Sequence, residues 1–180
     1  MRMNARSILF VSLFLSGYGM AQAPFPIMDG ETANDRRVTV PDLGSGRCTL
    51  IGMAFGKAAA PLLEEWYEPA YLRFVAKHGL FASSLDCDVY FVPVFVGVNK
   101  AAYGATIRKF KKSAEPEIVD HVIFYNGSFD EIRTQLALDL DNIPYFFVLD
   151  PGGRIIHRSD GKFTDEKLEA IEEVLLERAR

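Results

Sequence analysis

The chain has 180 residues, of which 49% are hydrophobic and 24% charged, and its formal net charge is −4. This length and apolar content fit one globular domain with a sizeable core and exclude a mainly disordered chain. The acidic balance argues against nucleic acid as a partner, and two cysteines are too few for a disulfide scaffold or an all-cysteine zinc site.

The N-terminus has the layout of a secretory signal peptide. Two arginines precede the apolar run 7–17, which is shorter than the roughly 20 residues that span a bilayer, and small residues follow. Cleavage after Ala21 is favoured over cleavage after Ala23, because Pro24 would hinder a peptidase at the second position. We expect a signal peptide at 1–21, export to the periplasm or the medium, and no integral membrane span after cleavage. An uncleaved anchor or a buried N-terminal helix is the alternative.

The first part of the mature chain predicts a lead followed by two strands. The polar segment 22–35 is expected to be a flexible lead, and the domain is expected to occupy 36–180. Residues 37–40 alternate polar and apolar before a proline, which is typical of a short edge strand. Residues 48–55 are apolar on both faces, as in a buried central strand.

The middle of the chain predicts a helix, a strand and a second helix. Apolar residues at spacings of three and four indicate a helix over 63–75, with a kink at Pro69. A second buried strand is expected over 88–98, where Pro93 suggests a bulge or an edge position. Residues 101–113 have a helical pattern.

The last third predicts a strand over 119–125, a short helix over 129–138, and a hairpin of strands 145–149 and 154–158. Thr164 is expected to cap a final helix. Buried strands that alternate with helices indicate an α/β fold with a mainly parallel sheet, covered by helices on both faces and closed by an antiparallel hairpin.

Two segments of this order, 48–61 and 141–156 (DNIPYFFVLDPGGRII), resemble the thioredoxin fold. The resemblance implies a cis peptide bond between Ile143 and Pro144. The strings TLIGMAFGKAAAPLLEEWYEP, VYFVPVF and DHVIFYNG, with the ending FFVLDPGGRIIHRSDG, are most similar to the thioredoxin-like proteins typified by the mitochondrial ATP-synthase membrane-sector assembly chaperone and its bacterial relatives. The apparent export signal and the Ile-Pro pair depart from that group.

Thioredoxin chemistry requires a thiolate at the start of the helix after the central strand, and a second thiol three residues on. These two places fall near Met53 and Gly56, and the window 52–61 contains no Cys, Ser or Thr. We therefore expect no catalytic residue here and no cofactor. The three histidines, His78, His121 and His157, have no metal-ligand spacing, so no metal site is expected.

Cys48 and Cys87 fall at the starts of two strands that are predicted to be parallel neighbours, at the end of the sheet opposite the helix N-terminus. Three interpretations are open: a structural disulfide, two buried free thiols, or a redox-active pair. The acidic residues Asp86 and Asp88 beside Cys87 disfavour a reactive thiolate.

The sequence thus favours a redox-inactive, exported binding module that acts as a chaperone or assembly factor for a client polypeptide or a membrane-protein subunit. Strand addition beside the late proline needs no cysteine. A thiol–disulfide oxidoreductase or peroxidase-like enzyme using Cys48 and Cys87 is one alternative, and a structural accessory domain of an envelope complex is another. The predicted binding groove consists of Met53, Phe55, Gly56, Lys57, Ile143 and Pro144.

The chain has one basic cluster, in the helix expected over 101–113. Its members are Arg108, Lys109, Lys111 and Lys112. A solvated helix face is one interpretation, and an acidic partner or anionic lipid headgroups are the functional alternatives.

Overall fold

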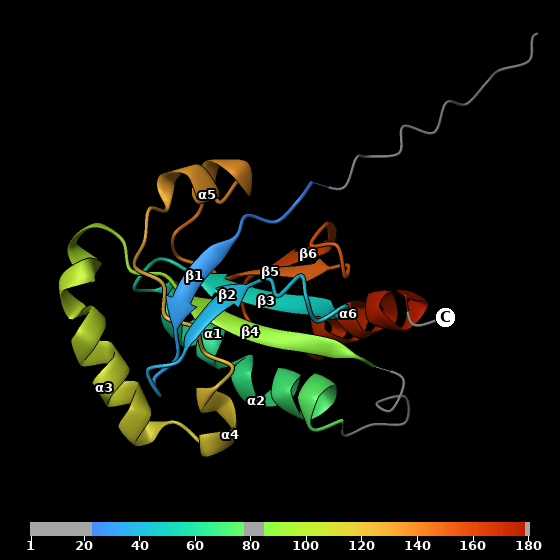
Figure 1. Cartoon of the computed structure of the whole chain (residues 1–180), viewed down its shortest axis with the longest axis horizontal. Coiled ribbons are helices and arrows are strands. Elements are labelled where there is room, and N and C mark those ends of the chain that lie inside the picture. Colours follow the sequence, from blue (N-terminus) through green and yellow to red (C-terminus); the bar gives the residue numbers. More distant parts are fainter. Residues whose placement is uncertain (1–22, 78–84, 179–180) are drawn as a thin grey trace, which may run out of the picture.

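The computed structural model describes residues 23–77 and 85–178. The expected signal peptide at 1–21 and His78 lie outside the described residues. At the centre is a four-stranded sheet in the order β4-β3-β5-β6 (Figure 1). Strands β3 and β4 are parallel, whereas β5 is antiparallel to both β3 and β6. Their bounds are Cys48–Ala54 for β3, Cys87–Pro93 for β4, Tyr145–Leu149 for β5 and Ile155–Asp160 for β6.

A further segment, 121–125, extends the sheet beyond β4, where the sequence predicts a strand over 119–125. It makes parallel ladder bonds, in which the Phe91 N–H donates to His121 O at 2.8 Å and the Phe95 N–H donates to Tyr125 O at 2.8 Å. Pro93 lies between these two bonds and has no N–H to donate, so the ladder is interrupted there. The first residue of the predicted strand, Val119, instead ends the short helix α4 (Pro116–Val119).

A separate antiparallel hairpin joins β1 (Met28–Glu31) to β2 (Arg37–Val40). Strand β1 lies inside 22–35, so this part of the chain is a paired strand rather than the flexible lead that the sequence predicts. The sequence does not predict this strand, because its pattern is polar. Met28 is its buried residue and packs with Val40. The hairpin meets the sheet where the Phe124 N–H donates to Glu31 O at 2.8 Å.

The helix expected over 63–75 is divided into three pieces: α1 (Ala59–Glu64), α2 (Tyr67–Ala70) and the π-helical turn η1 (Tyr71–Val75). The interruption comes before Pro69, because Pro69 has no N–H for the carbonyl of Glu65 four residues earlier. The Trp66 N–H donates to Leu63 O at 3.1 Å, which tightens the chain at the break.

The other helices of the described residues are the 3₁₀ turn η3 (Gly97–Ala102), α3 (Tyr103–Ser113), α5 (Asp130–Gln135) and α6 (Asp165–Arg178). Figure 1 shows α3 along one side of the molecule and α6 on the opposite side. Among the described residues, no helix is both long and apolar enough to cross a bilayer.

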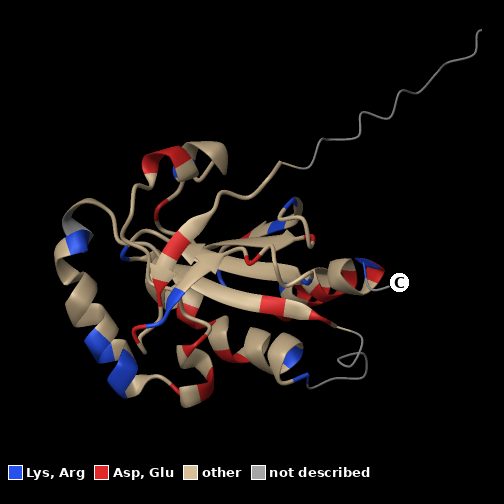
Figure 2. Ribbon diagram, in the orientation of Figure 1, with Lys and Arg blue, Asp and Glu red and all other residues tan. Residues whose placement is uncertain are grey.

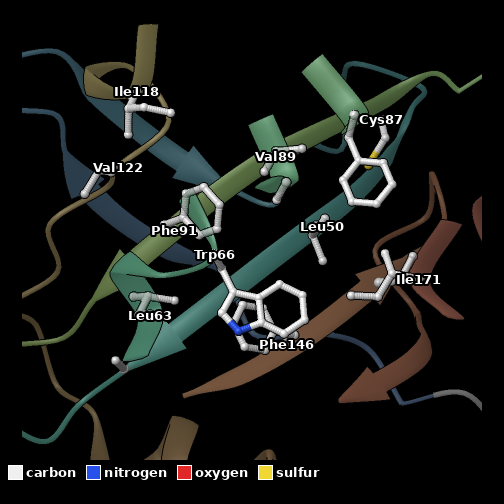
Figure 3. Packing of buried hydrophobic residues seen from close by; sticks show 14 of the residues in the cluster. Leu50, Leu63, Trp66, Cys87, Val89, Phe91, Ile118, Val122, Phe146 and Ile171 are labelled. Carbon is white, nitrogen blue, oxygen red and sulfur yellow. The ribbon is translucent and has the colours of Figure 1, made fainter. Parts of the chain in front are cut away.

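Two hydrophobic clusters form, one on each face of the sheet, because side chains along β3 alternate in direction. Leu50 and Ala54 join the cluster beneath α1, α2 and α6, whereas Ile51 and Met53 join the cluster beneath α5 and the β1–β2 hairpin. In the first cluster Trp66 lies on Phe146, with ring centroids 4.0 Å apart (Figure 3).

One expectation drawn from the resemblance is wrong. The cis peptide bond among the described residues is Val40–Pro41, and the Ile143–Pro144 bond is trans. The trans isomer is the lower-energy state of an X–Pro bond by about 0.5–1 kcal/mol, and no feature of the residues themselves required the other isomer.

Candidate binding site

A cavity of about 370 Å³ lies at the carboxyl ends of β3 and β4, between α1–α2 on one side and α3 on the other. This is the end of the sheet at which open α/β folds bind ligands. Its walls come from the loop after β3, the end of β4, and the helices α1, α2 and α3. The lining residues are Ala54, Phe55, Gly56, Lys57, Ala60, Leu63, Glu64, Tyr67, Pro93, Val94, Phe95, Ala102, Thr106, Phe110, Val122 and Phe124.

The cavity walls are mainly aromatic and aliphatic. Phe110 meets Phe124 edge to face at 5.4 Å between ring centroids, and Tyr67 lies 6.3 Å from Phe110. Phe124 also lies 6.2 Å from Phe95. Four rings from α2, α3 and the edge of the sheet therefore enclose the space, and rings of this kind favour an apolar or aromatic occupant.

Polar groups at the cavity are few. Lys57 and Glu64 are exposed lining residues, and Thr106 is a half-buried residue of its wall. Burial, followed by the nearby Glu64 carboxylate, raises the pKa of the Tyr67 phenol. The Tyr67 hydroxyl is protonated at neutral pH, as an ordinary tyrosine hydroxyl is.

Three of the six residues predicted for the groove line this cavity, namely Phe55, Gly56 and Lys57. Lys57 is exposed, but Phe55 is 4% exposed and also packs on Phe129, with ring centroids 5.0 Å apart. Phe55 therefore both packs in the hydrophobic core and lines the cavity.

The other three residues of the predicted groove lie elsewhere. Met53 is fully buried in the cluster on the opposite face of the sheet, because its side chain alternates away from that of Ala54. Pro144 is buried, and Ile143 is half-buried against the same opposite cluster. The Pro144 carbonyl already accepts a hydrogen bond from the Gly161 N–H at 2.8 Å, so an added strand would compete with that bond.

Gly56 holds the loop after β3 against the loop before β5. A β-carbon on Gly56 would lie 1.6 Å from the carbonyl oxygen of Asp141. Only glycine allows two backbones to approach so closely. The contact fixes the floor of the cavity relative to the 141–144 loop.

The two cysteines lie at the other end of the sheet, as the sequence predicts. Cys48 and Cys87 are directly opposite each other in the register of β3 and β4. Both are free and buried, so the interpretation as buried thiols describes this structure and the disulfide does not. Burial raises the pKa of both thiols, and the Cys87 thiol donates to the Asp88 carbonyl at 3.3 Å. Thiols in this state are poor nucleophiles.

The histidines of the described chain do not gather. The Nδ1 atom of His121 lies 2.8 Å from Val89 O, and His157 is half-buried on β6, where burial lowers the pKa of its imidazole. Within residues 23–77 and 85–178, no group of three His, Cys, Asp or Glu side chains could hold a metal ion.

Sequence reasoning missed the α3 wall of the cavity. Ala102 at the end of η3 and Thr106 and Phe110 of α3 recur every four residues and line the space. They lie beside Tyr103 and Ile107, which pack on the core. The four-residue spacing is visible in the sequence, but which elements face each other across a cavity depends on the tertiary structure.

Comparison with family models finds no match, and comparison with curated proteins finds none either. Solved structures do match. The thioredoxin domain of a thiol-disulfide oxidoreductase from Bacteroides vulgatus is 14% identical, with a TM-score of 0.56, over 86% of this chain and 96% of that chain. BsSco, a member of the Sco family of cytochrome c oxidase assembly proteins, is 13% identical, with a TM-score of 0.54, over 88% and 94%.

A third match is the pneumococcal exposed lipoprotein thioredoxin from Streptococcus pneumoniae, which is 10% identical, with a TM-score of 0.55, over 82% of this chain and 99% of that chain. Identities this low carry the fold and no more. Together with the mixed sheet, the terminal hairpin and helices on both faces, they confirm the predicted fold class. The chain has a thioredoxin-like fold.

Proposed function

We propose that this protein is an exported, redox-inactive binding module that holds a client polypeptide, or a subunit of a membrane protein, during its assembly. One observation carries the proposal. Where thioredoxins place their reactive thiols, this chain has a window without Cys, Ser or Thr at 52–61, and beside it lies an aromatic cavity of about 370 Å³. A cavity of this size accommodates an apolar side chain of a partner.

Two further observations support the assembly role and the export. The motifs at 49–69 and 146–161 resemble the assembly-chaperone family of the mitochondrial ATP synthase, and one matched structure, BsSco, is described as a member of a family of assembly proteins. The layout of residues 1–21 favours export, and another matched structure is described as an exposed lipoprotein.

The first experiment fills the cavity. Ala60 is a half-buried residue of its α1 wall, so Ala60→Phe should occupy the space with a ring. We expect the wild-type chain to bind the neutral dye Nile red and fluorescein-labelled, reduced and carboxymethylated α-lactalbumin. The Ala60→Phe variant should bind both roughly tenfold more weakly.

Ala170→Phe on α6, on the opposite side of the molecule, is the matched control and should bind as the wild type does (Figure 1). If Ala60→Phe does not fold, Thr106→Phe fills the same cavity from α3. Binding of the unfolded client that is undiminished in a folded, cavity-filled variant would reject this site.

A second candidate function is thiol–disulfide exchange by Cys48 and Cys87, which their direct register across β3 and β4 favours. Their burial and raised pKa values oppose it. Reduction of insulin disulfides by the wild-type chain, and loss of that activity in a Cys48→Ser/Cys87→Ser variant, would establish the exchange function and displace the first proposal.

A further inference from the structure

Helix α3 is a basic wall on an acidic protein. Its residues 103–113 include four Lys and Arg side chains and no Asp or Glu, although the chain as a whole has a net charge of −4. Figure 2 shows these basic residues gathered on α3. Lys111 is within 3.8 Å of Asp35, whereas among the described residues no carboxylate lies within 4.0 Å of the other three basic side chains. Those three are Arg108, Lys109 and Lys112, and all are exposed.

One of the exposed basic side chains, Lys109, lies next to the α3 wall of the aromatic cavity. Thr106 and Phe110 of α3 line it, and Lys109 follows Thr106 by three residues, which places the two on adjacent turns of the same side of the helix. Lys112 follows Lys109 by a further three residues, so it lies one turn further along α3 and further around the helix from Thr106. An occupant whose apolar group enters the cavity therefore has its neighbouring groups nearest to the Lys109 ammonium group, with Lys112 one turn beyond it.

The opposite wall has the other sign of charge. Glu64 lines the mouth from α1, and the exposed Glu68 follows one turn later on α2, while Lys57 lies at the loop. Carboxylates of a bound segment would be repelled from the α1–α2 side and attracted to the α3 side. The cavity therefore has an apolar interior between an acidic α1–α2 side and a basic α3 side.

We infer that the partner segment is an acidic peptide with one apolar anchor, whose side chain enters the cavity while adjacent carboxylates face Lys109 and Lys112 of α3. This inference rests on the proposed function as a binding module and specifies the chemistry of the client. The apolar cavity excludes water around the anchor side chain, and the positive charge of α3 favours segments with acidic residues next to that anchor.

The test uses three short synthetic peptides with a fluorescent label. One has a phenylalanine flanked by aspartates, the second has the same phenylalanine flanked by lysines, and the third has the aspartates with alanine in place of phenylalanine. We expect the first to bind ~10-fold more tightly than either of the others, and to weaken ~3–10-fold as salt rises from about 0.05 to about 0.5 M.

A charge exchange on α3 gives the sharper result. In a Lys109→Glu/Lys112→Glu variant we expect the acidic peptide to bind ~3–10-fold more weakly and the lysine-flanked peptide to bind more tightly than it does to the wild type. Lys162→Glu, an exposed position in the turn between β6 and α6, makes the same kind of charge change away from α3 and should alter neither affinity. A Lys109→Gln/Lys112→Gln variant replaces the pair if the reversed charges unfold α3.

Two outcomes would overturn the inference. Equal binding of the aspartate-flanked and lysine-flanked peptides, with Nile red still excluded by Ala60→Phe, would remove the acidic preference and leave the cavity as a general client site. Binding of vesicles rich in phosphatidylglycerol that depends on Lys109 and Lys112, with no peptide bound, would assign α3 to a membrane surface instead. If the wild-type chain itself binds neither Nile red nor α-lactalbumin, the proposed function fails, and this result is distinct from both outcomes above.

Discussion

Gly56 leaves no room for a side chain, because a β-carbon there would overlap the backbone of Asp141. We expect Gly56→Ala to force the two loops apart and to lower the free energy of unfolding by about 1–3 kcal/mol, in the range of other overpacking substitutions. Urea unfolding followed by circular dichroism measures this. Gly44→Ala is the control, since its β-carbon would meet only the side chain of Asp42, at 3.3 Å, and should change stability by less than about 0.5 kcal/mol. An unchanged midpoint for Gly56→Ala would mean that the two loops are not in this contact.

Cys48 and Cys87 predict a dependence of stability on alkaline pH. Burial raises the pKa of both thiols, so the unfolded chain loses these protons at a lower pH than the folded chain does. The stability that the neutral thiols contribute is complete below the ordinary thiol pKa, about 8.5, and is lost as pH rises above it. We expect the urea midpoint to fall between about pH 8 and about pH 10, and a Cys48→Ala/Cys87→Ala variant to show a smaller fall.

The same thiols should react slowly with a thiol reagent such as dithionitrobenzoate in the folded chain and rapidly once guanidinium unfolds it. Fast reaction of the folded chain at neutral pH would contradict the buried state of Cys48 and Cys87 and would favour the exchange function.

At the scale of single residues, the sequence shows which reactive atoms a segment contains, but not which side chains lie together. The absence of a nucleophile near Met53 and Gly56 follows directly from the residues, and so does the position of the cysteines away from that point. The residues of the predicted groove are divided between the two faces of the sheet, because residues adjacent along a strand point to alternate faces. Phe55, Gly56 and Lys57 reach the cavity, whereas Met53 is buried on the far face.

At the scale of elements, the cap of α6 is a clear consequence of local sequence. The Lys167 N–H donates to Thr164 Oγ1 at 3.4 Å, and the Leu168 N–H donates to Thr164 O at 3.2 Å. We expect Thr164→Ala to lower the free energy of unfolding by about 1 kcal/mol. Thr164→Ser should keep most of the wild-type stability, because serine is also a good N-cap residue. Equal stability of the two variants would show that Thr164 does not cap the helix.

The elements also show where local pattern has less control. Pro69 correctly indicated a break in the helix over 63–75. The break occurs at Glu65 and Trp66, because Pro69 has no N–H to donate to the Glu65 carbonyl. The strand predicted over 119–125 pairs only partly with β4, because Pro93 of β4 has no N–H to donate to it. In both cases the proline acts on residues that it does not adjoin.

At the scale of the whole molecule, one sheet serves both hydrophobic clusters, and its strands contribute side chains to each. We therefore expect a single cooperative unfolding transition. Trp66, the chain's one tryptophan, is fully buried, and its Nε1 donates to Gly161 O at 3.3 Å, so its fluorescence reports the first cluster. Its midpoint in urea should coincide with the midpoint from far-ultraviolet circular dichroism. Two separated transitions would mean that the faces of the sheet unfold independently.

The sequence by itself determined the α/β class, the terminal hairpin and the absence of Cys, Ser and Thr from residues 52–61, because periodicity, turn residues and residue identity are local properties. Only the tertiary structure decided that α3 faces α1 and α2 across an aromatic cavity, that β1 is a strand, and that Pro144 is buried. Those features depend on contacts between segments far apart in the chain. The physical reason is that a cavity belongs to the packing of several elements, and no single element specifies it.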